Sequence, residues 1–183
     1  MKKLTLIVIV FLLCGCSTSR SLDGIDIDKI YKSFDSSFSF IHENFYCSTP
    51  HWVLDPDYEH CDENHACRSN IFSSLVEFKD YMVNYYSLSQ SFTDKLIKRR
   101  YPDLLYEKDD GLYVIDADSG GDFSIGKELK RRLIRQSENT IVLKVWYEFV
   151  DLTDFKVKGS FEVDNVAVLI EGQWLWDDIP EVY

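Results

Sequence analysis

Three of the four histidines and three of the five cysteines fall within residues 47–67. Zinc is bound by thiolate and imidazole groups in tetrahedral sites, so a metal site is one interpretation of this composition. The spacing argues against it, because His60 and Cys61 are adjacent and the gap from Cys61 to Cys67 is wider than in zinc modules. We therefore favour a disulfide and expect no metal. The candidate residues are Cys47, His51, His60, Cys61, His65 and Cys67.

A second cluster of chemically capable residues is the acidic stretch 116–123, Asp-Ala-Asp-Ser-Gly-Gly-Asp-Phe. It begins like the calcium loop of an EF-hand. Gly120 takes the fifth position, however, and Lys127 takes the twelfth, where a bidentate glutamate is needed. We predict a glycine-rich acidic loop between strands, without bound calcium.

Acid–base chemistry is the third possibility, because a carboxylate, tyrosine or histidine in an apolar pocket acquires a shifted pKa. The candidates are His42, Asp116, Asp118 and Tyr147, and nothing in their spacing distinguishes them from surface residues. The motifs G-x-S-x-G, H-E-x-x-H and C-x-x-C-H and the P-loop are all absent from the sequence. We expect no catalytic activity and no cofactor.

The start of the chain predicts export. Lys2 and Lys3 precede an apolar run over 4–13 that is shorter than the roughly 20 residues needed to span a bilayer. The residues Leu13-Cys14-Gly15-Cys16 that follow resemble the bacterial lipobox. This resemblance implies a signal peptide over 1–15 and diacylation of Cys16, with palmitate-type chains numerous enough for stable anchoring.

The same resemblance indicates where the protein is located and how the chain is divided. Ser17, rather than an aspartate, follows Cys16, which favours the outer membrane, facing the periplasm, if the host is Gram-negative. Residues 16–22 are expected to form a lipidated tether. Residues 23–183 are expected to form a single domain, with the cysteine-containing insert at about 47–67.

An oxidising compartment makes a disulfide the default for the remaining cysteines, and three thiols leave one over. We predict the pair Cys47–Cys67, because Cys47 ends one predicted helix and Cys67 precedes the next. Closing this loop would contribute about 3 kcal/mol. Cys61 is the alternative partner.

The formal net charge of −11 argues against nucleic acid and anionic lipid as ligands. Two basic clusters, at 98–100 and 130–132, interrupt the acidic character. Because the chain is so acidic, we expect both clusters to lie on solvent-exposed faces. A basic binding patch is the alternative. We expect membrane attachment through the lipid anchor, an envelope protein as partner, and no nucleic acid.

Hydrophobic periodicity predicts helices first and strands afterwards. Helices are expected over 26–45, 69–86 and from Ser91 to Pro102, the last with the capping-box spacing of Ser91 and Asp94. Strands are expected over 112–116, 140–150, 161–170 and 173–179, while 126–137 fits either a helix or a charged edge strand. Trp146 should lie on the opposite face from Tyr147, and Trp174 and Trp176 on one face. This order predicts an α+β fold with helices on one face of an antiparallel sheet.

The closing segment Gln173-Trp174-Leu175-Trp176-Asp177-Asp178-Ile179 resembles the final hairpin of small NTF2-like (cystatin-like) envelope proteins, and 91–97 resembles their third helix. With Gly111-Leu112-Tyr113, these features also resemble secreted inhibitors of cell-wall DL-endopeptidases, over about residues 70–180. The first resemblance implies helices packed against a curved antiparallel sheet.

The function expected from these resemblances is that of a non-enzymatic, lipid-anchored envelope protein that binds a partner protein or a small ligand at the periplasmic face. Two alternatives stay open. The first is an inhibitor or immunity protein against a cell-wall hydrolase or toxin. In it, the insert at about 47–67 would block the active site with its acidic residues Asp55, Asp57, Glu59, Asp62 and Glu63, and we call it the acidic insert. The second is an NTF2-like enzyme that uses the pocket of the cone.

Overall fold

The computed structural model describes residues 22–46, 61–64, 66–101, 103–115, 125–151 and 153–180. Helices come first and long antiparallel strands last, so the predicted α+β class is confirmed. Within these ranges no helix is both long enough and apolar enough to cross a bilayer. The predicted signal peptide and Cys16 lie outside the described residues.

The helical elements are α1 (Ile27–Ile41), a π-helical turn η1 (His42–Tyr46) that continues it, α2 (Leu75–Tyr86) and α3 (Gln90–Arg100). The strands are β1 (Ala66–Arg68), β2 (Leu105–Lys108), β3 (Gly111–Ile115), β4 (Ile125–Arg135), β5 (Thr140–Asp151), β6 (Lys156–Ile170) and β7 (Gln173–Asp178). They form two antiparallel sheets, in the orders β1-β3-β2 and β4-β5-β6-β7.

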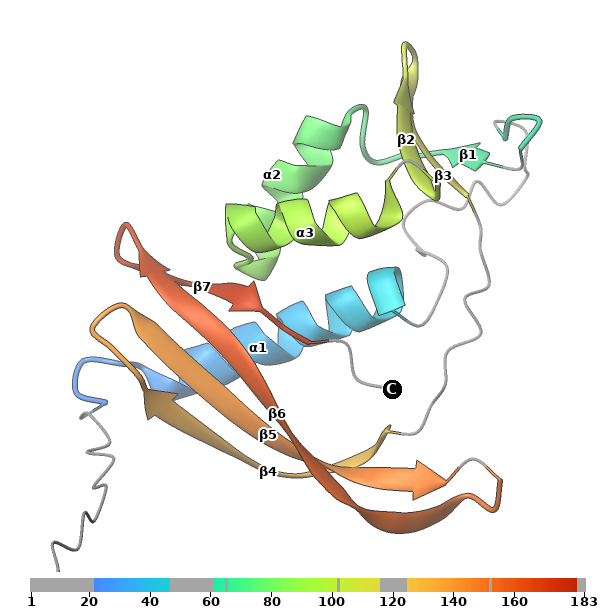
Figure 1. Ribbon diagram of the computed structural model, residues 1–183. Coiled ribbons are helices and arrows are strands. Elements are labelled where there is room, and N and C mark those ends of the chain that lie inside the picture. The colour runs from blue at the N-terminus through green and yellow to red at the C-terminus, as the bar shows by residue number, and fades with distance from the viewer. Residues whose placement is uncertain are drawn as a thin grey trace, which may run out of the picture.

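The expectation of one sheet was therefore wrong, since β3 belongs to a separate small sheet. Its partner β2 was not predicted, and the two strands are joined by a short turn in which Lys108 pairs with Gly111. The Arg68 side chain lies over Gly111, where an added Cβ would be 2.7 Å from its Nε. The small sheet lies at the end of the molecule next to α2 and α3, away from the large sheet (Figure 1).

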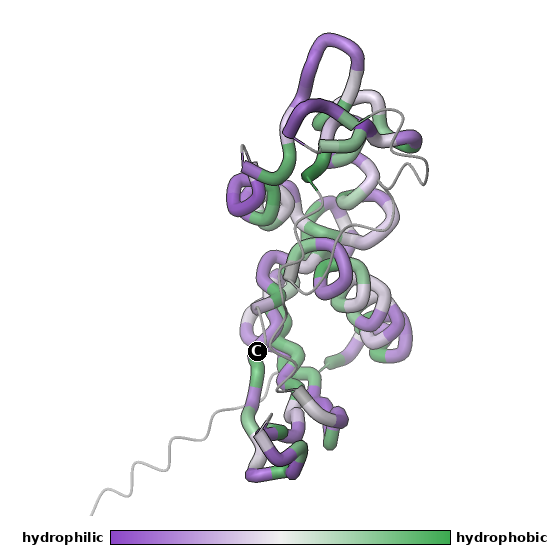
Figure 2. The backbone as a smooth tube through the Cα atoms, turned by 90° about the vertical axis from the view of Figure 1, so that its right-hand side faces the viewer, coloured by the Kyte–Doolittle hydropathy of each residue, from purple (hydrophilic) through white to green (hydrophobic). Residues whose placement is uncertain are grey.

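Figure 1 and the perpendicular view in Figure 2 show α1 between the large sheet and the pair α2 and α3. Two faces of α1 are accordingly buried. Phe34 packs edge-on against Trp176 of the sheet, at 5.2 Å between ring centroids. On another face, Phe40 stacks on Tyr86 of α2 at 3.9 Å, and the Ser37 hydroxyl donates to the Tyr86 carbonyl. Helix α1 is thus the central layer of the fold.

Helix α2 begins later than the predicted residue 69, for a local reason. The Ser69 hydroxyl accepts a hydrogen bond from the backbone N–H of Phe72 and holds the preceding residues in a turn. Ser74 then caps the helix by accepting from the N–H of Glu77. Short polar side chains compete with helical hydrogen bonds in this way, which apolar periodicity does not reveal.

Helix α3 is capped by Ser89, whose hydroxyl accepts from the N–H of Phe92, so the predicted capping box at Ser91 was wrong. The helix ends at Arg100, and Tyr101 has the extended conformation (φ −87°, ψ 141°) favoured before a proline. The basic residues 98–100 form its last turn, where positive charge offsets the helix dipole.

The large sheet confirms the predicted alternation along β5. Tyr147 is buried on the core side, and Trp146, on the other side, lies 4.1 Å below the ammonium group of Lys130. The ambiguous segment 126–137 belongs largely to β4, an edge strand paired with β5. The predicted hairpin at residues 171 and 172 is also confirmed, because Glu171 (φ 49°) and Gly172 (φ 80°) both have the positive φ of a type I′ turn.

Trp176 joins the large sheet to the helical layers. It is 1% exposed, and its indole N–H donates to the Ser33 hydroxyl of α1. Its backbone exchanges hydrogen bonds with Ser87 and Ser89, which flank the buried Leu88 between α2 and α3. Trp174 packs against the same core, so the prediction that the two tryptophans share a face is confirmed.

Candidate functional site

A disulfide joins Cys61 and Cys67, so the predicted pairing Cys47–Cys67 was wrong and the alternative partner was the right one. A tight turn brings the two cysteines opposite each other. Within it, one carboxylate oxygen of Asp62 accepts from the backbone N–H groups of Asn64 and Ala66. Cys47 lies outside the described residues.

The histidines proposed as alternative zinc ligands, at positions 51, 60 and 65, also lie outside the described residues. Where the structure is described, no group of three or more histidine, cysteine, aspartate or glutamate side chains is arranged to hold a metal ion. The acidic loop that begins at Asp116 is likewise outside the described part.

Asp62 belongs to the acidic insert that the inhibitor interpretation requires to protrude. Its side chain is only 12% exposed and is turned inward, where it accepts hydrogen bonds from Lys108 and Tyr106 of the small sheet. The hydrogen bond from Lys108, which has the largest effect, and the one from Tyr106 hold the pKa of the Asp62 carboxyl well below its ordinary value. This carboxylate therefore stabilises the small sheet instead of facing a partner.

Two of the four acid–base candidates meet in an aromatic cluster under α1. Phe38 stacks on His42 at 5.6 Å and on Tyr147 at 6.1 Å between ring centroids. Burial raises the pKa of Tyr147 above its ordinary value. Burial also lowers the pKa of His42, although the negative charge of Glu43 acts in the opposite direction. Burial therefore favours the uncharged form of both rings. Asp116 and Asp118 lie outside the described residues.

The basic run 130–132 divides between the two faces of the sheet. Lys130 lies over Trp146 on one face. Arg131 lies on the other, within 2.6 Å of Glu128 and 2.8 Å of Asp35. The hydrogen bonds to Glu128 and then Asp35 raise the pKa of Arg131. The run is therefore not one continuous basic patch.

An open groove lies between α1 and α2, and we call it the aromatic groove. Its volume is about 910 Å³ including its open mouth. Tyr81 lies edge-on to both members of the stacked pair Phe40 and Tyr86, and burial raises the pKa of Tyr86 to about 12. Ile71 lines the groove and is 54% exposed. The lining residues are Ser36, Ser39, Phe40, Glu43, Asn44, Ile71, Phe72, Tyr81 and Tyr86.

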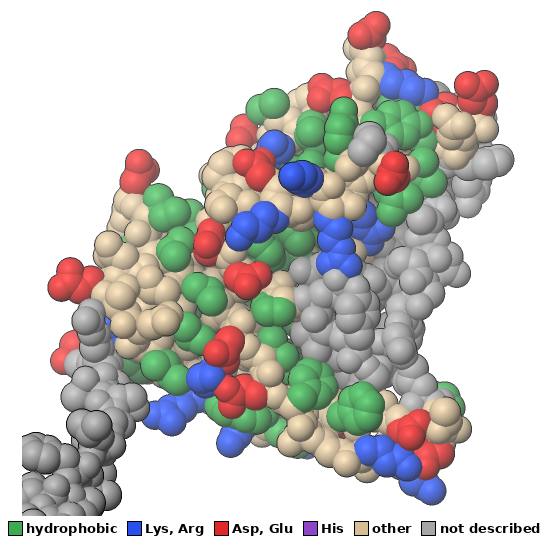
Figure 3. Space-filling model, viewed as in Figure 1, with side chains coloured by type: hydrophobic (Ala, Val, Ile, Leu, Met, Phe, Trp, Pro, Cys, Tyr) green, Lys and Arg blue, Asp and Glu red, His purple; other side chains and the backbone are tan. Residues whose placement is uncertain are grey.

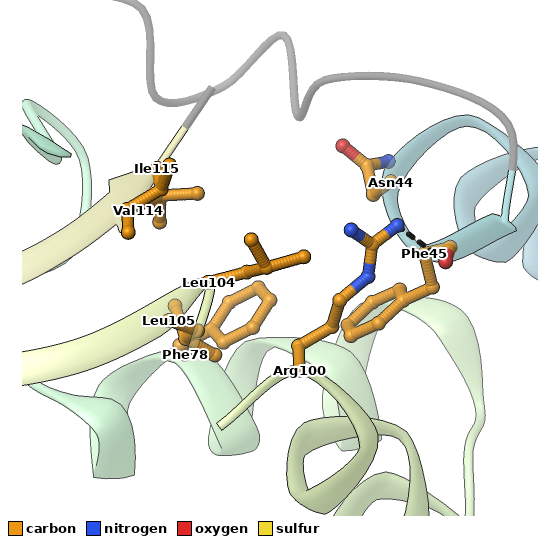
Figure 4. Close-up of a pocket in the computed structure, with 8 residues that line it drawn as sticks. All are labelled: Asn44, Phe45, Phe78, Arg100, Leu104, Leu105, Val114 and Ile115. Carbon is orange, nitrogen blue, oxygen red and sulfur yellow. Dashed lines mark hydrogen bonds between the residues drawn. The ribbon is translucent and has the colours of Figure 1, made fainter. Parts of the chain in front are cut away.

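A second, smaller pocket shares Asn44 with the groove, and we call it the Asn44 pocket. Its cavity volume is about 20 Å³, which is room for about one water molecule. Figure 4 shows the Asn44 amide and the Arg100 guanidinium at one end of it and apolar side chains at the other. Arg100 donates to the backbone carbonyl of Phe45. The lining residues are Asn44, Phe45, Phe78, Arg100, Leu104, Leu105, Val114 and Ile115.

Asn44 is the polar residue of this pocket that sequence reasoning missed. It is 7% exposed, and its Nδ2 donates to the Phe40 carbonyl at 2.7 Å. Its Oδ1 is buried and accepts no hydrogen bond within the described part of the chain. A buried acceptor without a partner costs about 1–3 kcal/mol. One sequence feature could have identified Asn44. It is a polar residue that lies between the apolar Ile41 and Phe45, near the end of a predicted helix.

No protein-family model matches the chain, and no curated protein is detectably similar to it in sequence.

Proposed function

We propose that this protein is a lipid-anchored, non-catalytic envelope protein that binds a partner protein through the aromatic groove. The observation that carries the proposal is the groove itself. Its lining includes two buried phenylalanines, Phe40 and Phe72, two half-buried tyrosines, Tyr81 and Tyr86, and an apolar residue, Ile71, that is more than half exposed. A concave surface lined by aromatic side chains with a few polar groups is the usual composition of a binding site.

The chemistry of the groove favours a partner surface with an apolar side chain next to a cationic one. Tyrosine rings such as Tyr81 accept both aliphatic groups and, through their π faces, lysine or arginine. Glu43 is exposed beside these rings, and the chain as a whole carries a net charge of −11. Negative potential of this size also steers positively charged partners toward the surface.

The proposed anchor is compatible with this location of the groove. A tether over residues 16–22 reaches at most about 24 Å, at roughly 3.4 Å per residue, and residues 23–26 connect it to the start of α1 at Ile27. The groove residues Ser36 to Asn44 follow nine or more positions after Ile27, and α1 rises about 1.5 Å per residue. A tether of this length is compatible with a partner protein reaching the groove.

Two further observations support the proposal. Helix α1 lies across one face of an antiparallel sheet, as the resemblance to NTF2-like envelope proteins requires. The candidate acid–base residues His42 and Tyr147 pack against Phe38 and line neither the aromatic groove nor the Asn44 pocket, so neither surface contains a candidate acid–base residue.

The test compares partner capture by three forms of the native lipoprotein in membranes of the producing cell. Ile71→Asp places a charge at the groove. Val157→Asp is the matched control, because Val157 is 55% exposed on β6, where it belongs to a different surface. We expect cross-linking followed by mass spectrometry to give one partner with the wild type and with Val157→Asp, and at least tenfold less with Ile71→Asp.

Equal capture by all three forms would refute the groove as the binding site, and absence of any protein partner would refute the proposed function. The identity of the partner also decides between a general envelope binding protein and the inhibitor alternative. A wall hydrolase or toxin whose activity falls on binding would establish the latter.

A further inference from the structure

A cavity of about 560 Å³ opens where α1 begins, and we call it the Trp174 pocket. Its volume lies within the range of about 300–1,000 Å³ that is typical of small-ligand sites. The first turn of α1, the turn between β6 and β7 and the end of α2 contribute to its lining, and Figure 1 shows the first two at the same end of the fold. Among the described residues, none that lines this pocket also lines the aromatic groove or the Asn44 pocket.

One part of the lining is apolar. Ile30 of α1 is 5% exposed, and Leu169 of β6 and Trp174 of β7 are half-buried. Leu169 and Trp174 are directly opposite each other in the β6–β7 ladder, so their side chains lie on the same face of the sheet. The indole of Trp174 is a large, flat apolar surface that can pack against the C–H groups of a ring-shaped ligand.

Polar groups that lack a partner accompany this apolar surface. Within the described part of the chain, the Lys29 ammonium, the Gln173 amide and the Trp174 indole N–H form no hydrogen bond or ion pair. The indole nitrogen is not a buried atom, so a ligand can reach it. One carboxylate oxygen of Asp26 accepts from the backbone N–H of Lys29, and the other is available. The pocket therefore offers both donors and acceptors.

Ser87 adds a hydroxyl at a backbone position that does not favour serine. It follows the last residue of α2 in the left-handed conformation, with φ 51° and ψ 37°. Glycine is the usual residue at this position because it has no Cβ. Ser87 lines the pocket, and its hydroxyl has no partner among the residues that the structure describes. A side chain that is retained in an unfavourable backbone conformation is consistent with a functional role.

The charges that line the pocket favour a neutral ligand. Lys29 and Asp26 carry opposite charges and offset each other. The guanidinium of Arg135 donates to the backbone carbonyls of Ser137 and Glu138, so its hydrogen-bonding groups are engaged within the chain. Figure 3 shows mainly apolar and uncharged polar atoms over the end of the molecule that contains the β6–β7 turn, whereas lysine and arginine side chains gather over α3.

From these features we infer that the Trp174 pocket binds a neutral saccharide of one or two rings. One face of a sugar ring packs against Trp174, and its hydroxyl groups bond to Lys29 and Asp26. Hydroxyl groups suit this mixed lining because each one both donates and accepts, whereas a peptide N–H only donates and a peptide C=O only accepts. Hydrogen bonds to charged side chains are also stronger than those between neutral groups. This site goes beyond the proposed function, which concerns the aromatic groove.

The test titrates the full-length chain by calorimetry, in a detergent whose headgroup is not a sugar. Cellobiose and N,N′-diacetylchitobiose are the saccharide probes, because they have the same rings and linkage and differ only in the acetamido groups. Tri-alanine represents a short peptide. We expect one or both saccharides to bind at millimolar concentration or below, and tri-alanine to bind at least tenfold more weakly. The tighter of the two saccharides shows whether the ligand carries acetamido groups.

Surface variants connect binding to the pocket. Lys29→Ala and Gln173→Ala each remove an exposed polar group and should weaken saccharide binding at least fivefold. Lys32→Ala is the matched control, because Lys32 is exposed on the same helix and does not line the pocket. Trp174→Ala removes the apolar surface and should abolish binding. Ile71→Asp, in the aromatic groove, should leave binding unchanged, which separates this inference from the proposed function.

The inference is overturned if neither saccharide binds at millimolar concentration, or if tri-alanine binds as tightly as they do. Saccharide binding that is as tight in both Lys29→Ala and Gln173→Ala as in Lys32→Ala would also overturn it. Should Trp174→Ala fail to fold in thermal unfolding, the exposed variants and the comparison of the probes still decide the question.

Discussion

Replacing Phe34 with alanine tests how strongly α1 is held against the large sheet. Phe34 is 1% exposed, and its ring lies 5.2 Å from that of Trp176 and 5.5 Å from that of Phe38. The substitution removes the side chain that contacts both the sheet and the next turn of α1. It leaves the aromatic groove and the Asn44 pocket untouched, because Phe34 lines neither.

The expected loss of stability follows from the burial of Phe34 and from its contacts with other rings. Truncating a buried phenylalanine to alanine costs about 3–5 kcal/mol, and aromatic pairs contribute beyond burial, so we expect about 4–5 kcal/mol for Phe34→Ala. For a domain of 150 to 250 residues, each kcal/mol lowers Tm by about 2–4 °C. The Tm should therefore fall by roughly 8–20 °C.

Urea and thermal unfolding, followed by tryptophan fluorescence, measure this loss, and Trp176 is a reporter next to the substitution. Phe155→Ala is the control, because Phe155 is 79% exposed and its removal should change stability by less than about 0.5 kcal/mol. A loss below about 1 kcal/mol for Phe34→Ala would refute the assignment of α1 as the central layer of the fold.

Three further predictions concern local features. Replacing both Cys61 and Cys67 with alanine should lower the free energy of unfolding by about 2 kcal/mol, because the disulfide closes only a short loop; non-reducing peptide mapping that found either cysteine bonded elsewhere would contradict this. Asp62→Asn should reduce stability at neutral pH. Because the pKa of Asp62 is lowered in the folded state, the difference from the wild type should be full above the unfolded value of 3.8 and shrink as the pH falls below it. A difference that does not vary with pH in acid denaturation would contradict the role of this carboxylate. Gly126→Ala should destabilise the fold by about 1–3 kcal/mol, since the added Cβ would lie 2.8 Å from side-chain carbons of β5. Gly159→Ala on the same sheet meets no atom within 4 Å and should be close to neutral, so equal effects of the two in chemical unfolding would refute the packing argument.

Local periodicity was sufficient to predict the elements whose structure depends on nearby residues. The apolar spacing along 26–45 corresponds to α1 and η1, and the alternation along 140–150 corresponds to β5. The hairpin at residues 171 and 172 was predictable because a tight turn there needs a residue such as Gly172. The starts of α2 and α3 were less predictable, since several serines compete to cap them and only one in each case does so.

The sequence by itself determined that the described chain is α+β, that its helices precede its strands, and which faces of β5 and β7 are apolar, because these properties follow from repeats of two or of three to four residues. Only the tertiary structure decided that Cys67 bonds to Cys61, that β3 leaves the large sheet, and that Asn44, Arg100 and Val114 meet in one pocket. Those outcomes depend on packing between segments far apart in the chain, and local spacing contains no information about which distant surfaces will be buried together.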